Sequence, residues 1–140
     1  MLAFTFPGQG SQKPSMGSEW VEHESWELVD EASAACGRDV SQLLLEADAD
    51  ELKQTRNSQL TTFVLSMVVL DAVERTGVAP NFAAGHSLGE YSALCASGAL
   101  SFEDAVRLVA ERGEAMQVAA DEQDGTMAAI LGLDDDLVVS

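Results

Sequence analysis

Short apolar runs closed by turn residues mark the candidate strands of this chain. The first run is Leu2–Phe6, which Pro7 and Gly8 bound, and the second is Phe82–Gly85. A third run is Met127–Leu131. Apolar runs of this length between turn residues are typical of buried β-strands. The pattern therefore predicts strands at three points of the chain.

Between the first two strands, apolar positions recur at roughly helical spacing. Residues 19–51 carry eleven acidic side chains and a single basic one, Arg38, so the acids are expected on the solvent side of helices. A long helix follows, with a cap predicted at Asn57 or Ser58 and an end near Gly77.

Two further helices are predicted after the second strand. One covers Tyr91–Ala96 and stops at Gly98. The other begins with the capping-box pattern Ser101–Asp104 and runs to about Val118. Alternation of strand and helix predicts an α/β fold with parallel strands.

Composition narrows the class of protein. The chain has 140 residues, 24 acidic against 7 basic, and a net charge of −17. The length predicts one domain, and the charge disfavours nucleic acid and anionic membranes, which need a basic surface. No apolar window reaches the ~18 residues of a membrane span, and the N-terminus has no basic segment of a secretory signal.

Cysteine and histidine are scarce. Cys36 and Cys95 form no CxxC pair, and two histidines are too few for a zinc site of the Cys/His kind. We expect two buried free thiols in a cytoplasmic protein, with a disulfide as the alternative.

The stretch Gly85–Gly89 reads Gly-His-Ser-Leu-Gly and matches the pattern G-x-S-x-G. A serine on a tight turn from strand to helix is held in a strained conformation with its hydroxyl exposed, and the helix beginning at Leu88 aims N–H groups at the same place. Ser87 is therefore a candidate nucleophile for acyl transfer. The alternative is an ordinary glycine-rich turn.

A serine nucleophile needs a base, and no histidine follows Ser87. His86 is adjacent, so its side chain leaves the turn in another direction and is expected to be structural, whereas His23 lies in the acidic segment and is expected to be solvated. Either the turn is inert, or part of the enzyme lies outside this chain.

Arg112 is the second informative residue. On the helix after Ser101 it shares a face with apolar residues, and a guanidinium that faces inward needs an anion. The anion is either an internal carboxylate such as Glu90 or the carboxylate of a substrate. The residues of this face are Ala105, Leu108, Val109, Arg112 and Met116.

The loop within Phe6–Gln12 is the third feature. Its glycines allow main-chain N–H groups to approach a ligand, although no Gly-Lys-Ser/Thr follows as in a phosphate-binding P-loop. A plain connecting loop is the alternative.

Together these stretches resemble the malonyl-CoA:acyl carrier protein transacylase family of fatty acid biosynthesis, which includes the acyltransferase domains of polyketide and fatty acid synthases. The GHSLGEYSAL form looks more like the freestanding bacterial enzyme. The matching stretches are Phe6–Gln12 (FPGQGSQ), Gly85–Leu94 (GHSLGEYSAL), Asp104–Met116 (DAVRLVAERGEAM) and Gly125–Leu133 (GTMAAILGL).

The resemblance implies roles for individual residues. Ser87 would be the acylated nucleophile, and the main-chain N–H groups of Gln9 and Leu88 would form the oxyanion hole. Arg112 would bind the free carboxylate of the malonyl group. The family's base is a histidine well downstream, so this chain would be the N-terminal half of the enzyme and inactive alone.

The resemblance also implies a fold and partners. Residues 1–125 would belong to an α/β-hydrolase-like core, and residues 126–140 would begin a ferredoxin-like inserted subdomain with Met127–Leu131 as its first strand. The partners would be malonyl-CoA, an acyl carrier protein bearing phosphopantetheine, and the C-terminal half of the enzyme. No metal or redox cofactor is implied.

Two other functions use the same features. A serine esterase or thioesterase has the same turn, although an inward Arg112 argues against a plain acyl chain. A non-catalytic fragment or interaction module is the other alternative. Acyl carrier proteins are acidic like this chain, so a basic docking surface is expected in a local patch or in the C-terminal half.

Overall fold

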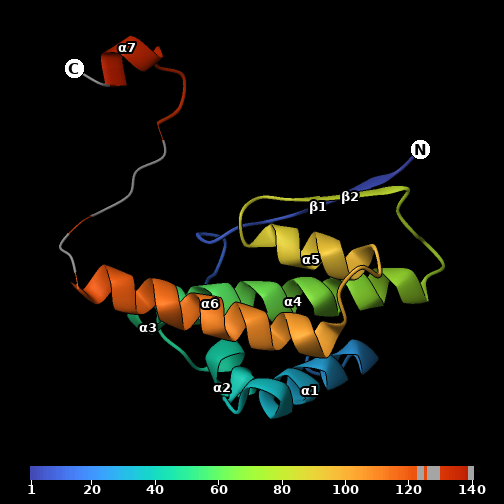
Figure 1. Ribbon diagram of the computed structural model, residues 1–140. Coiled ribbons are helices and arrows are strands. Elements are labelled where there is room, and N and C mark those ends of the chain that lie inside the picture. The colour runs from blue at the N-terminus through green and yellow to red at the C-terminus, as the bar shows by residue number, and fades with distance from the viewer. Residues whose placement is uncertain (123–124, 126–129, 139–140) are drawn as a thin grey trace.

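Two parallel strands, β1 (Ala3–Phe6) and β2 (Phe82–Gly85), lie side by side in the computed structural model of the chain (Figure 1). The structure describes residues 1–122, 125 and 130–138. Ala3 pairs with Phe82 and Phe6 with Gly85. The apolar runs predicted both strands and the alternation of strand and helix predicted their parallel direction, and both predictions are confirmed.

Helices and the loops that connect them form the rest of the described chain. The long helix α4 lies below the strands and α5, with α6 beside it and α1 and α2 on the far side (Figure 1). The helices are η1 (Glu24–Trp26), α1 (Glu27–Cys36), α2 (Val40–Leu45), α3 (Ala49–Lys53), α4 (Thr55–Arg75), α5 (Gly89–Ala96), α6 (Phe102–Glu122) and α7 (Asp135–Val138).

Helix α4 is the centre of the hydrophobic core. Leu60, Phe63, Val64 and Val68 are fully buried, because α1, α5 and α6 all pack against this helix. A helix enclosed on several sides is apolar around much of its circumference, which is why α4 lacks the clear polar face of a surface helix.

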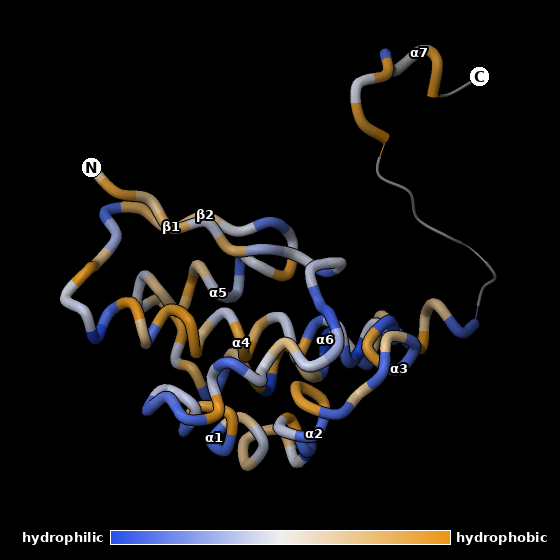
Figure 2. Tube along the Cα trace, turned by 180° about the vertical axis from the view of Figure 1, so that it is seen from behind, coloured by the Kyte–Doolittle hydropathy of each residue, from blue (hydrophilic) through white to orange (hydrophobic). Residues whose placement is uncertain are grey.

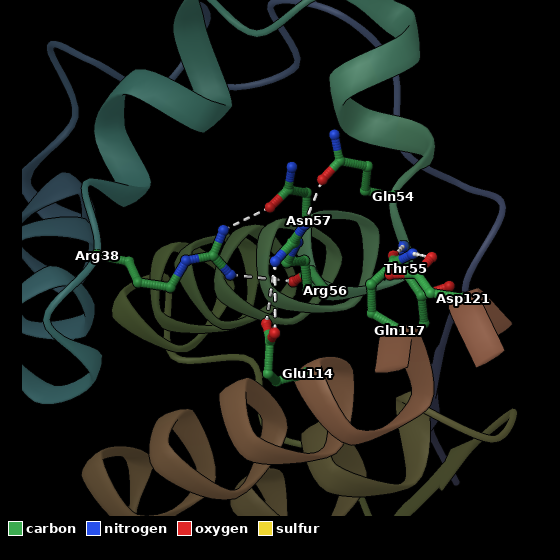
Figure 3. A network of polar contacts seen from close by, with 8 residues as sticks. All are labelled: Arg38, Gln54, Thr55, Arg56, Asn57, Glu114, Gln117 and Asp121. Carbon is green, nitrogen blue, oxygen red and sulfur yellow. Dashed lines mark hydrogen bonds and ion pairs between the residues drawn. The ribbon is translucent and has the colours of Figure 1, made fainter. Parts of the chain in front are cut away.

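The predicted cap of α4 is wrong. The helix begins at Thr55, and Asn57 and Ser58 are buried within its first turn. The N–H of Thr55 donates instead to Oε1 of Gln117 at 2.7 Å (Figure 3). A side chain 62 positions away supplies the acceptor, so local sequence signals do not mark this helix start.

The boundaries of α6 agree better with the sequence. The N–H of Asp104 donates to Oγ of Ser101 at 3.2 Å, and the Ser101 hydroxyl donates to the Asp104 carboxylate at 2.7 Å. The helix continues to Glu122, beyond the predicted end near Val118. The predicted strand Met127–Leu131 falls mostly on residues 126–129, which lie outside the described residues.

One face of the two-stranded sheet is open in the described part of the chain. Helix α5 packs on the other face, whereas Phe82 on the outer face is 59% exposed. Both strands are apolar along most of their length (Figure 2). An apolar groove of about 430 Å³ also runs between β1 and α4, with Phe4, Leu65 and Val69 in its lining. Parallel sheets in proteins are normally covered on both faces.

An ion-pair network joins the end of α4 to the start of α1. Arg75 lies 2.6 Å from Asp71, 2.9 Å from Glu24 and 2.7 Å from Glu27. Burial raises the pKa of Asp71, but hydrogen bonds from Ser25 and Arg75 and the charge of Arg75 outweigh it, so the pKa lies below its ordinary value of 3.8. This stabilisation is therefore present at neutral pH and is lost as the pH falls through the lowered pKa.

The cysteines and the lengths of the helices test two further predictions from the sequence. Cys36 and Cys95 are both free, as predicted, but they are half-buried and not fully buried. Burial raises the pKa of the Cys95 thiol to about 11. Among the described residues, no helix is both long and apolar enough to cross a membrane.

Replacing Arg75 with Gln is expected to lower the melting temperature by roughly 2–4 °C in dilute salt. Three carboxylates would then face one another in a chain of net charge −17. Salt at ~1 M shortens the screening length to about 3 Å, so the difference should shrink there. Circular dichroism melts over a NaCl series measure the effect.

Arg107→Gln is the matched control. Arg107 pairs with Glu103 and Asp104, which lie in its own helix α6, so its loss separates no packed elements. An equal fall in melting temperature for both variants would show that the Arg75 network does not join α4 to α1.

Candidate active site

Ser87 lies at the turn between β2 and α5 with its backbone in the left-handed region, at a φ of 53°. The N–H of His86 donates to the carbonyl of Phe6 at 3.2 Å, and the N–H of Gly89 donates to the carbonyl of His86 at 3.0 Å. A residue with a Cβ rarely adopts this backbone conformation, because the Cβ crowds the following carbonyl. The strained, exposed serine predicted from the sequence is confirmed.

The two glycines of the turn allow the helix to approach the strands. A Cβ at Gly85 would lie 1.9 Å from the carbonyl carbon of Gly89, and a Cβ at Gly89 would lie 2.3 Å from the carbonyl oxygen of Phe6. Both contacts are with backbone atoms, which a rotamer change cannot relieve. Only glycine fits at either position without moving α5 away from the sheet.

The loop after β1 lies against this turn. A Cβ at Gly8 would lie 2.7 Å from the carbonyl oxygen of His86, so the two loops touch at their backbones. In the described residues no protein acceptor takes the N–H of Gln9 or of Leu88. The structure thus brings together the two loops in which the sequence predicted oxyanion donors.

Arg112 of α6 reaches the same turn. Its Nη2 donates to Oγ of Ser87 at 3.1 Å, and its Nη1 donates to Oε1 of Gln59. The guanidinium carbon lies 5.9 Å from the centre of the Tyr91 ring. Arg112 has no carboxylate partner among residues 1–122, and Glu90 is exposed, so the predicted alternative of an ion pair with Glu90 is wrong.

The predicted buried face of α6 is shifted. Leu108 is 45% exposed and Met116 is 37% exposed, and Arg112 lies half-buried at the edge of the packed face. The close approach of α6 to α4 causes the shift, because a Cβ at Gly113 would lie only 3.0 Å from the Cα of Arg56. The buried residues of α6 are Ala105, Val106, Val109 and Gly113.

Gln59 is a site residue that the sequence reasoning missed. It is fully buried in α4, and besides accepting from Arg112 it donates from Nε2 to Oε1 of Gln9 at 3.3 Å. The signal was an amide side chain at the start of a long apolar segment. A buried amide needs partners, so such a residue points toward a polar site.

Neither histidine is placed as a base. The Nδ1 of His86 lies beside Gly8, 2.7 Å from where a Cβ would stand, and the side chain has no hydrogen bond to Ser87 in the described structure. His23 is exposed and accepts from the N–H of Ser25 at 3.1 Å, capping η1. No group of three or more potential metal ligands occurs in the described part of the chain.

Comparison with known proteins agrees with this geometry. Residues 3–138 match the family described as acyl transferase domain. A malonyl CoA-acyl carrier protein transacylase of Bacillus subtilis is 50% identical over 135 residues, covering 95% of this chain and 43% of the relative.

Solved structures of malonyltransferases also resemble this chain. The acyl-carrier-protein-S-malonyltransferase of Bartonella henselae superposes with a TM-score of 0.85 at 38% identity, over 99% of this chain and 46% of that one. The structure of a type II polyketide acyl-carrier protein in complex with its malonyl-transacylase contains a chain that superposes with a TM-score of 0.77 at 38% identity. The match covers 84% of this chain and 39% of that one. The chain thus spans less than half the length of these relatives.

We expect Ser87→Gly to be more stable than Ser87→Ala by about 1 kcal/mol, because glycine adopts a positive φ without the cost that a Cβ imposes. Both variants lack the hydroxyl, so the difference isolates backbone strain. Urea unfolding measures the two free energies.

The same pair of substitutions at Ser66, in the interior of α4, is the control. There glycine should be the less stable by about 1 kcal/mol, because it is a poor helix former. The same sign at both positions would rule out stored strain at Ser87.

Proposed function

The chain belongs to the acyl transferase domain family, and from that premise we propose that its protein transfers a malonyl group from malonyl-CoA to the phosphopantetheine thiol of an acyl carrier protein. One observation carries the proposal. The half-buried guanidinium of Arg112 lies 3.1 Å from the hydroxyl of Ser87 and has only neutral partners in the described structure. A cation so placed is complementary to an acyl group that carries a second, negative end.

In the first half-reaction, Oγ of Ser87 attacks the thioester carbonyl of malonyl-CoA. The hydroxyl proton passes to a base, the carbonyl oxygen becomes an oxyanion, and the carbon–sulfur bond breaks to release CoA as its thiol. The N–H groups of Gln9 and Leu88 would stabilise the oxyanion. Loss of one such donor costs about 2.7–4 kcal/mol in activation free energy.

Arg112 would bind the carboxylate of the malonyl group. One methylene separates this carboxylate from the acyl carbon, so a cation beside the nucleophile is within its reach. On binding, Nη2 would exchange the neutral Ser87 oxygen for a charged oxygen, which is the stronger acceptor. A plain acetyl group offers no such partner, which is how the site would distinguish the two thioesters.

In the second half-reaction, the phosphopantetheine thiol attacks the ester carbonyl, and Oγ of Ser87 leaves and regains a proton. The similar malonyl-transacylase solved with its acyl-carrier protein supports this acceptor. In a protein as long as the relatives, we place the base, a histidine, and a basic docking surface in polypeptide outside this chain. No metal or redox cofactor takes part in these steps.

The open sheet face and the apolar groove beside β1 support the same view of the whole protein. In a protein of the relatives' length, further polypeptide would cover these surfaces as part of an α/β-hydrolase-like core, to which we assign residues 1–125. We assign residues 126–140 to the start of a ferredoxin-like subdomain. Two free cysteines fit the reducing cytoplasm, where we place the protein.

Incubation of the full-length protein with malonyl-CoA is expected to add one malonyl group to Ser87, detectable by peptide mass spectrometry. Arg112→Ala should slow this labelling by about 10–100-fold, because charge-assisted hydrogen bonds to the carboxylate are lost. Labelling by acetyl-CoA should change much less, since an acetyl group does not use the guanidinium.

Arg107→Ala is the matched control, because Arg107 lies on the same helix and is exposed. It should leave both labelling rates unchanged. Equal labelling of the unsubstituted protein by the two thioesters would contradict carboxylate selection and favour an esterase or thioesterase.

A further inference from the structure

We propose that Gln59 is a positioning residue that joins the guanidinium of Arg112 to the loop carrying Gln9, so that one buried amide sets the two ends of the acyl site relative to each other. The inference rests on the proposed function, because it assigns the carboxylate to Arg112 and the oxyanion to the Gln9 loop. It adds a residue of α4 that touches neither substrate end directly.

The contacts of Gln59 reach both ends. Its Oε1 accepts from Nη1 of Arg112, and its Nε2 donates to Oε1 of Gln9 at 3.3 Å. Nε2 also lies 3.2 Å from Sδ of Met116. The side chain of Gln59 is fully buried, so its amide relies on these protein partners for its hydrogen bonds.

The direction of the amide is fixed by charge. A guanidinium only donates hydrogen bonds, so it requires the oxygen of Gln59. The NH₂ group must then face the opposite way, toward Gln9. A reversed amide would place two donors in contact inside the protein, which costs the desolvation of both.

The backbone that carries Gln59, the first turn of α4, is bound to α6 by polar contacts. Gln59 lies one helical turn after Thr55, whose N–H donates to Gln117, and Gln117 in turn donates to Asp121 at 2.8 Å (Figure 3). Arg56 pairs with Glu114 of α6 at 3.4 Å in the same network. The first turn of α4 is thus tied to the helix that carries Arg112.

The loop after β1 also contacts the first turn of α4. Nε2 of Gln9 lies 3.5 Å from Oγ1 of Thr55. Gln9 therefore meets α4 at two residues, Thr55 and Gln59, which lie on one face of the helix. The side chain of Gln9 is held while its N–H stays free for a ligand.

Substrate binding would leave the Gln59 contact in place. A malonyl carboxylate would take Nη2 from Ser87, whereas Nη1 would stay on Gln59. The long side chain of Arg112 would then need little reordering when the substrate arrives. Without the amide, it would have to be ordered by the substrate itself, which lowers the affinity for the charged acyl group.

The test compares labelling of Ser87 by malonyl-CoA and acetyl-CoA in the full-length protein. Gln59→Met keeps the size of the side chain but removes both hydrogen bonds. We expect labelling by malonyl-CoA to fall by about 10–100-fold, and the ratio of malonyl to acetyl labelling to fall by at least about tenfold.

Gln59→Glu keeps the shape and the acceptor but adds a negative charge beside Arg112. The new carboxylate would occupy the cation, so labelling by malonyl-CoA should fall further than in Gln59→Met. Acetyl labelling should stay within about threefold of the Gln59→Met rate, because acetyl needs no cation. Should Gln59→Met fail to fold, Gln59→Leu, which also removes both hydrogen bonds without adding a charge, takes its place.

Thr62→Val is the matched control, since Thr62 is buried on the same helix and its hydroxyl has no partner in the described structure. It should leave the ratio unchanged. A Gln59 variant that folds and keeps the ratio of the unsubstituted protein overturns the positioning role. An unsubstituted protein that shows no preference for malonyl-CoA overturns the proposed function instead, so the two failures are distinct.

Discussion

The contact between the start of α5 and the ends of the two strands is the constraint on which the site depends. At Gly89 the helix backbone is so near the carbonyl of Phe6 that a Cβ would lie 2.3 Å from it. In this space the chain turns from β2 into α5 with Ser87 at a positive φ of 53°. Strain at Ser87 and exposure of its hydroxyl thus follow from one close approach, and α6 and the loop after β1 complete the surroundings.

A partly buried polar network reaches this turn through Arg112 and lies at the edge of the apolar core. Helix α4 lies at the centre of the apolar core, yet its first turns carry Thr55 and Gln59, whose partners lie on α6 and on the loop after β1. Buried hydrogen bonds of this kind are directional, whereas apolar contacts are not. The network therefore fixes the relative placement of elements that apolar packing alone would hold loosely.

Arg112 lies beside Ser87 without an acidic partner in the described chain. The net charge is −17, yet Arg112 contacts a hydroxyl and an amide and no carboxylate in the described chain. Arg75 pairs with three acids, whereas Arg38, which also lacks a carboxylate partner in the described chain, donates to the carbonyl of Arg56 and to Asn57. A half-buried guanidinium that has no acidic partner can form strong, charge-assisted hydrogen bonds to an anion that enters from outside.

The sequence alone determined the strands and the tight turn at Ser87, because apolar runs and the spacing of Gly85, Ser87 and Gly89 act through local geometry. The alternation of strands and helices along the chain indicated the parallel direction. It also singled out Arg112, since a cation among apolar positions is visible from periodicity. Tertiary structure decided the start of α4, the shifted face of α6 and the role of Gln59. Each of these depends on partners more than fifty positions away, at Gln117, Arg56 and Arg112, and the energy of such a contact exists only once packing brings the two segments together.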